Sequence, residues 1–146
     1  MSGERYELSN WESMDLLGTG GIGRLCIIEQ GFPLAVPVNY RIDGESVGAQ
    51  TVIIRTAPTT LIGRYEGPAS LEVDEIDLDA GTAWSVIVRG TVRRVLGTHD
   101  LPDPKPLLSE GRLQWMSMPV GAVSGRRFRL ESREDRFAVE WQMVAG

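Results

Sequence analysis

Three glycines near the start of the chain have the spacing that holds a pyrophosphate group in dinucleotide-binding folds. Gly18, Gly20 and Gly23 form the pattern G-x-G-x-x-G. In those folds a strand runs into the glycines and a helix leaves them, so the pyrophosphate meets the helix N-terminus. Here the flanking residues predict the reverse order. The pattern therefore predicts a helix-to-strand connection, with Gly18 just past the helix C-terminus, and a dinucleotide site is not expected.

The residues around the glycines predict these two elements. Ser9 followed by Glu12 has the pattern of a capping box and predicts a helix over 10–18. Residues 23–30 are rich in apolar and β-branched residues and predict a strand. The helix carries an apolar stripe at helical spacing, formed by Trp11, Met14 and Leu17.

Residue types that carry out catalysis or bind metals are scarce. His99 is the only histidine and Cys26 the only cysteine, which is too few for a zinc site. His99 lies in a proline-rich connection over 97–111, where we expect it to face solvent, and Cys26 lies in an apolar strand, where a buried inert thiol is expected. No catalytic side chain and no metal ligand is assigned. A bound cofactor would then supply the chemistry.

An acidic run resembles a calcium site but has the wrong spacing. Counted from Asp77, the twelfth position is Val88, where a calcium-binding hand loop has glutamate. The run therefore predicts a solvated turn between two strands. Its members are Asp74, Glu75, Asp77 and Asp79.

Composition predicts one soluble domain over 1–146. The apolar fraction is 42% and the charged fraction 24%, which is ordinary for a globular protein. A net charge of −5 argues against a nucleic-acid partner or binding to an anionic membrane. No apolar run approaches the length that spans a membrane, and we expect a cytoplasmic protein.

Beyond the first helix the chain is predicted to be mostly β. Asp43-Gly44 marks a hairpin turn between strands over 33–42 and 45–57, and residues 59–67 predict one or two helical turns. The clearest strand, 83–97, carries Gly90 as a bulge or bend, and its buried face is marked by Val86, Val88 and Val92. Further strands are predicted over 69–77, 113–123, 125–132 and 136–144. About six strands, mainly antiparallel, predict a mainly β fold that closes into a barrel.

The predicted strands contain, in order, PLAVPVNYRIDGESV, VIIRTAP, LEVDEIDLDAGTAWSVIVRGTV and SGRRF. Together these stretches resemble the pyridoxamine 5′-phosphate oxidase-like flavoproteins, from the first helix to about Phe128. The resemblance implies an FMN-binding split β-barrel that forms a homodimer, with FMN in the grooves between the subunits.

The resemblance also implies which residues bind the cofactor. Val38 and Asn39 would contact the flavin ring, largely through backbone groups. Arg55 would grip the phosphate, since a guanidinium binds phosphate bidentately. Thr56, on the same strand as Arg55, would contact the ring and the ribityl phosphate. Trp84 and Ser85 would face the cofactor from another strand.

One position departs from the family pattern. Relatives have a lysine that helps to hold the phosphate, where this chain has Leu61. A leucine cannot neutralise a phosphate dianion. Thr60 could donate one hydrogen bond, and Arg64 could reach the same place. The departure leaves a deazaflavin coenzyme, haem or an empty groove as alternatives to FMN.

Two functions follow from the resemblance. One is a flavin-dependent oxidoreductase acting on an unidentified small molecule, and the other is a non-catalytic split barrel that binds or senses flavin or haem. The chain lacks the C-terminal Arg-x-His motif of pyridoxamine phosphate oxidase itself.

A homodimer is also expected from the strands themselves, because an apolar terminal strand over 136–144 would be an exposed edge in a monomer. Large apolar residues on the predicted strands would cover the interface: Trp84, Trp115, Phe128, Phe137 and Trp141.

Overall fold

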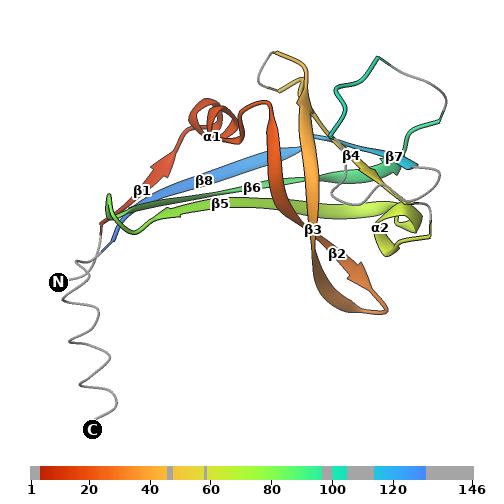
Figure 1. Ribbon diagram of the computed structural model, residues 1–146, viewed down its shortest axis with the longest axis horizontal. Helices are drawn as coiled ribbons and strands as arrows, with labels where there is room; N and C mark the ends of the chain where they lie inside the picture. Colours follow the sequence, from red (N-terminus) through yellow and green to blue (C-terminus); the bar gives the residue numbers. More distant parts are fainter. Residues whose placement is uncertain (1–3, 46–47, 58, 97–99, 105–113, 131–146) are drawn as a thin grey trace, which may run out of the picture.

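The structure is a computed structural model that describes residues 4–45, 48–57, 59–96, 100–104 and 114–130. These residues form one antiparallel sheet and two helices (Figure 1). The elements are β1 (Glu4–Leu8), α1 (Asn10–Leu17), β2 (Gly20–Glu29), β3 (Phe32–Asp43), β4 (Thr51–Thr56), α2 (Leu61–Arg64), β5 (Gly67–Asp77), β6 (Thr82–Arg94), β7 (Gln114–Pro119) and β8 (Ala122–Arg129). The predicted mainly β, antiparallel fold is confirmed.

Six strands close into a barrel, and two lie outside it. The sheet runs β1-β8-β6-β5-β2-β3-β4-β7, and an additional pairing between β6 and β7 closes the ring. One edge of β6 is shared: Thr82–Arg89 pairs with β8, and Arg93 and Arg94 pair with β7. In Figure 1, β5, β6 and β8 are the long ribbons that lie side by side, and β3 crosses them steeply.

Glycines allow close contact where β6 passes from β8 to β7. A Cβ added to Gly90 would lie 2.4 Å from the carbonyl oxygen of Pro119, so only glycine fits there without movement. Gly121 donates from its backbone N–H to the Arg89 carbonyl oxygen at 2.8 Å. Of the bulge or bend predicted at Gly90, the bulge is absent, because the β5–β6 register continues through the pair Ala69–Gly90 without an extra residue. Gly90 instead allows the backbone of Pro119 to approach β6 closely.

The core lies inside the barrel and follows the period of two that strands impose. Val86, Val88 and Val92 are fully buried, as predicted from their alternation. The other strands contribute their own alternating positions. These buried side chains include Leu25, Ile27, Val52, Ile54, Leu71, Val73, Met116 and Met118.

Helix α1 covers one part of the barrel and matches its predicted start. Ser9 and Glu12 form both hydrogen bonds of the capping box. Met14 and Leu17 are buried, but Trp11 is 64% exposed, so the predicted apolar stripe is wrong at that position. The Tyr40 hydroxyl donates to the Leu17 carbonyl oxygen at 2.9 Å, and burial raises the pKa of Tyr40 to about 12.

The three glycines of G-x-G-x-x-G have structural roles. Gly18 ends α1 with a φ of 62°. Gly20 has a φ of 154°, and a Cβ there would lie 2.3 Å from the Tyr40 carbonyl oxygen. A Cβ on Gly23 would lie 2.9 Å from Leu71. The predicted helix-to-strand connection is confirmed, and the glycines allow β2 to approach the neighbouring strands.

Several predictions concern residues outside the described part of the chain. They are His99, most of the proline-rich connection, and the strand over 136–144 with Phe137 and Trp141.

Cys26 is only half-buried in β2, so its predicted burial is wrong. Strand β1 was not predicted, and it adds an eighth strand by pairing with β8.

Candidate functional site

Arg55 lies on the outer face of the barrel, near the end of β4. Val52 and Ile54 on this strand are buried in the core, and side chains alternate between the two faces of a strand, so Arg55 points away from the interior. Its cross-strand neighbour on β7 is Trp115. The guanidinium carbon lies 5.0 Å from the centre of the Trp115 ring, which holds the cation against the barrel wall.

An aspartate from the connection after β6 pairs with Arg55. Arg55 Nη1 donates to Asp103 Oδ2 at 2.6 Å, and the two side chains are 25% and 39% exposed. The Asp103 carbonyl oxygen also accepts from Arg41 Nε at 3.4 Å. Arg55 Nε is buried and has no hydrogen-bond partner within the described residues. One donor of this cation is therefore held by a carboxylate, and another is unsatisfied.

Two threonine hydroxyls lie just beyond Arg55, where β4 leads into α2. Thr56 is the last residue of β4 and Thr60 is the N-cap of α2, and their Oγ1 atoms are 2.9 Å apart. The Thr60 hydroxyl also accepts from the Gly63 N–H at 3.0 Å. Thr60 thus serves as a helix cap, and Leu61 is half-buried against the core.

Val38 and Asn39 lie on β3, where its pairing with β4 ends. The last β3–β4 pair is Tyr40–Ile54, so Asn39 and Arg55 are the next residues along the two strands. The described part of the chain places no strand against that edge of β3 from Phe32 to Val38. The Val38 side chain is buried in the core. The Ile42 N–H donates to the Thr19 carbonyl oxygen, and backbone groups of alternate residues face the same edge of a strand, so the Val38 backbone faces β2 and the Asn39 backbone faces the open edge.

Trp84 and Ser85 lie on a different part of the sheet, because β2 and β5 separate their strand, β6, from β3. Both are half-buried on β6, and Trp84 pairs with Glu75 on β5. The end of this ladder near α2 is the pair Gly67–Val92, eight residues away, or about 26 Å at the usual rise of a strand. The fold therefore brings Val38, Asn39, Arg55, Thr56 and Thr60 to one region, and it leaves Trp84 and Ser85 outside that region.

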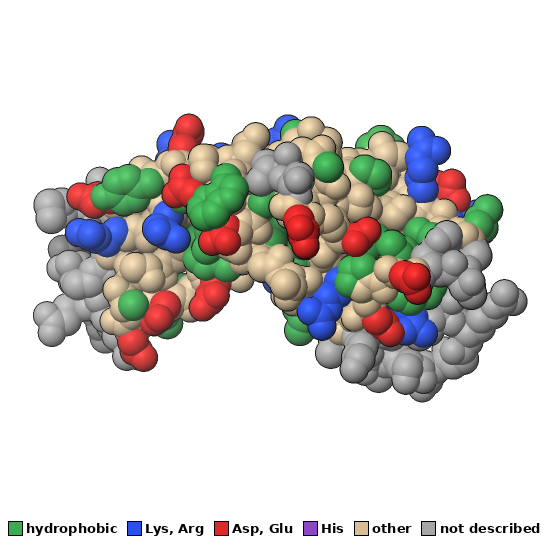
Figure 2. All heavy atoms as spheres, turned by 90° about the horizontal axis from the view of Figure 1, so that it is seen from above, with side chains coloured by type: hydrophobic (Ala, Val, Ile, Leu, Met, Phe, Trp, Pro, Cys, Tyr) green, Lys and Arg blue, Asp and Glu red, His purple; other side chains and the backbone are tan. Residues whose placement is uncertain are grey.

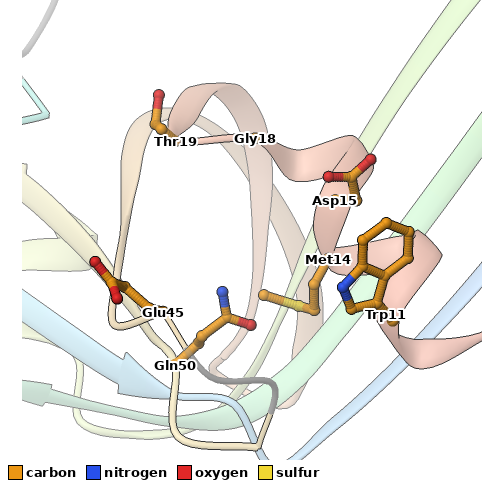
Figure 3. A pocket seen from close by; sticks show the side chains of 7 residues that line it. All are labelled: Trp11, Met14, Asp15, Gly18, Thr19, Glu45 and Gln50. Atoms are coloured by element: carbon orange, nitrogen blue, oxygen red, sulfur yellow. The ribbon is translucent and has the colours of Figure 1, made fainter.

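A separate pocket of about 280 Å³ lies between α1 and the β3–β4 connection (Figure 3). Trp11, Met14 and Asp15 line it from the helix, and Glu45 and Gln50 line it from the connection. None of the described residues that line it is basic, and none belongs to the predicted site. Two carboxylates without a cation repel phosphate, so Arg55 remains the better candidate for binding an anion.

Elsewhere the ionisable groups form surface pairs. Arg24 on β2 contacts Glu72 at 3.0 Å and Asp74 at 2.8 Å on β5. Partial burial raises the pKa of Asp74, but the hydrogen bond and charge of Arg24 lower that pKa overall. The predicted turn after β5 is confirmed, with Asp77 Oδ1 accepting from two backbone N–H groups of the turn.

Among the described residues, no group of three or more His, Cys, Asp or Glu could hold a metal ion. None of the described helices has the length and apolar character needed to cross a membrane.

Sequence reasoning did not identify two residues of the Arg55 cluster. Trp115 alternates with the buried Met116 and Met118 on β7, and this pattern places it on the outer face. Asp103 lies in a proline-rich connection with no regular pattern, so nothing local indicates its contact with a residue 48 positions away.

Comparison with known proteins places the chain in a family. A sequence model described as pyridoxamine 5′-phosphate oxidase matches residues 9–126. The chain therefore belongs to the pyridoxamine 5′-phosphate oxidase family, as its residues predicted. It is also 29% identical over 127 residues to the uncharacterized protein Rv0080 of Mycobacterium tuberculosis, covering 82% of this chain and 78% of that protein.

Solved structures confirm the split β-barrel fold. A putative pyridoxamine 5′-phosphate oxidase of Corynebacterium glutamicum has a TM-score of 0.72 at 24% identity, covering 91% of this chain and 99% of that one. An FAD-binding protein of Mycobacterium smegmatis has a TM-score of 0.66 at 26% identity, covering 86% and 100%. An FAD and haem binding protein of the same organism has a TM-score of 0.60 at 14% identity, covering 91% and 79%.

Proposed function

We propose that this protein is a flavin-dependent oxidoreductase that binds FMN at Arg55 and acts on a small molecule. The single observation that carries the proposal is the outward-facing Arg55, stacked on Trp115 at the point where β3 and β4 separate. Family membership supports it, because similar solved structures are described as FAD-binding proteins. The bound flavin would supply hydride or electron transfer, and the protein would supply position and electrostatics.

The residues of this region fit a phosphate monoester. Arg55 has a buried, unsatisfied Nε donor, and the Thr56 hydroxyl lies on the next residue of the strand. The uncovered edge of β3 presents the backbone of Asn39 to a flat ring. Two features weaken the fit: Leu61 supplies no charge, and Asp103 competes for the same guanidinium.

A homodimer completes the proposed site. Trp84 and Ser85 lie on β6, separated from β3 by two strands and about 26 Å along the sheet from the α2 end, at about 3.3 Å per residue, so in this proposal they contact the flavin from the partner subunit. A groove between two barrels would also cover both faces of a flat ring. In such a site Val38 and Asn39 orient the ring, Arg55 and Thr56 hold the phosphate, and the partner excludes water.

The test compares FMN with riboflavin, which lacks the phosphate. If Arg55 holds the phosphate, Arg55→Ala should weaken FMN binding by about 1.5–3 kcal/mol, the range for a charge-assisted hydrogen bond, and riboflavin binding should change much less. Fluorescence titration of both flavins measures this. Equal losses for the two ligands would show that Arg55 is not a phosphate ligand.

The absorption spectrum of the purified protein separates the main alternatives. Flavin bands that bleach when a reductant is added would show a bound flavin that can be reduced, which the oxidoreductase requires. A Soret band would favour a non-catalytic haem-binding protein, and a deazaflavin coenzyme would show its own absorption band. A colourless protein that takes up none of FMN, FAD and haem would overturn the proposal.

A further inference from the structure

Arg55 already has an anionic partner within its own chain. Asp103 Oδ2 lies 2.6 Å from Arg55 Nη1, a short distance for a charge-assisted hydrogen bond. The pair lies on the outer face of β4, and Asp103 is the more exposed partner at 39%. A phosphate that binds Arg55 would have to approach the same guanidinium.

Asp103 is held in place by a second contact. Its backbone carbonyl oxygen accepts from Arg41 Nε at 3.4 Å, and Arg41 Nη1 lies 3.4 Å from Thr19 Oγ1. The following residue, Pro104, is buried. The backbone around Asp103 is therefore anchored beside Arg55.

We infer that Asp103 is an internal competitor for the phosphate site and sets its selectivity for anions. The carboxylate satisfies Arg55 when no phosphate is bound, and a phosphate dianion must displace it. Asp103 largely cancels the charge of Arg55, and Leu61 adds no second cation beside it. Weak or monoanionic ligands therefore gain little by binding. This inference rests on the proposed function for the identity of the flavin. It adds a role for Asp103 in the specificity of the site.

The first test uses inorganic phosphate as the probe and does not depend on any flavin. Asp103→Asn keeps the shape of the side chain and removes its charge, so it should bind phosphate about tenfold more tightly than the unchanged protein in low-salt calorimetry, the scale of one charge-assisted contact. Asp103→Glu restores the charge and should restore weak binding. Arg55→Ala in the Asp103→Asn background should abolish the gain.

A matched control separates this effect from net charge. Asp100 is an exposed aspartate of the same segment, and Asp100→Asn changes the net charge equally. Phosphate affinity that rises in Asp103→Asn and not in Asp100→Asn supports the inference. An equal rise in both variants, or a rise in neither, overturns it. Thermal unfolding of each variant verifies that all of them are folded.

A second arm uses flavins and separates this inference from the proposed function. In Asp103→Asn the ratio of FMN affinity to riboflavin affinity should rise about tenfold, since only FMN carries the phosphate. Flavin binding with an unchanged ratio would overturn the role of Asp103 and leave the proposed function standing. A gain in inorganic phosphate binding with no flavin bound by any variant would support the role of Asp103 and refute flavin binding.

Discussion

At the level of single residues, three side chains bear most directly on the charge offered to a phosphate. Arg55 supplies the cation, Asp103 pairs with it at 2.6 Å, and Leu61 adds no charge at the place where the resemblance implies a lysine. The energetic contribution of the pair is modest, because ion pairs between partly exposed side chains stabilise a fold by about 0–1 kcal/mol. Its main effect is on the ligand, which meets a guanidinium that is already engaged.

Restoring the lysine of the relatives tests the position of the phosphate. Leu61→Lys should tighten FMN binding more than riboflavin binding, by about 1 kcal/mol at low salt, with the gain reduced as salt screens the charge. Titrations of both flavins at two salt concentrations measure the effect. Because Leu61 packs on the core, thermal unfolding should be followed in parallel.

Thr59→Lys is the control for Leu61→Lys, since Thr59 is exposed and lies two residues earlier. It should give a smaller change in FMN affinity than Leu61→Lys does. If Leu61→Lys gives no FMN-specific gain at low salt, the phosphate does not lie beside α2.

At the level of elements, the barrel closes because one edge of β6 pairs first with β8 and then with β7. Thr82–Arg89 pairs with β8, and the pairing passes to β7 at Arg93. At the crossing, the backbone of Pro119 lies so close to Gly90 that no side chain fits between them. The same crossing places β7, and with it Trp115, beside β4 and Arg55.

Gly90→Ala tests the close approach at this crossing. The added Cβ would lie 2.4 Å from the Pro119 carbonyl oxygen, so the backbone must shift, and we expect a loss of about 1–3 kcal/mol in the free energy of unfolding. Gly21→Ala on β2 is the control, because its nearest neighbour would be Tyr40 at an ordinary 3.7 Å. Denaturant unfolding compares the two variants. Equal stability in both would mean that the strands do not meet as closely as the structure places them.

At the level of the whole molecule, apolar side chains are exposed on the β2–β3 hairpin, which projects beyond the long strands in Figure 1. Figure 2 shows one face of the molecule, where apolar side chains are exposed among interspersed acidic and basic ones. An uncovered strand edge beside exposed apolar groups favours association with another copy. The exposed fractions on the hairpin are 57% for Ile22, 54% for Ile28 and 74% for Phe32.

We therefore expect a homodimer that involves the β2–β3 hairpin. Light scattering should give twice the 16.1 kDa mass of one chain, and Phe32→Glu should shift the equilibrium towards the monomer by placing a charge in an apolar contact. Trp11→Glu, at an exposed aromatic residue of α1, is the control and should leave the mass unchanged. A mass of one chain for the unmodified protein across a dilution series would refute the dimer and the shared site.

Local patterns in the chain were sufficient for most elements. The capping box at Ser9, the alternation of Val86 and Val88, and the short helix after Thr60 all depend on residues within a few positions of one another. Such signals are present in the sequence because hydrogen bonds of caps and the period of strands are local. Strand β1 lacked such a signal, since four of its five side chains are exposed.

Contacts between distant segments were settled by the fold alone. The exposure of Trp11, the close approach at Gly90 and the contact of Asp103 with Arg55 each depend on which strands become neighbours. That pairing is a property of the closed sheet and its register, and one residue of slip would reverse the face of every side chain. Arg55 could therefore be named from the chain as a candidate phosphate ligand, through the family resemblance, whereas its carboxylate partner, 48 residues away, required the barrel to close first.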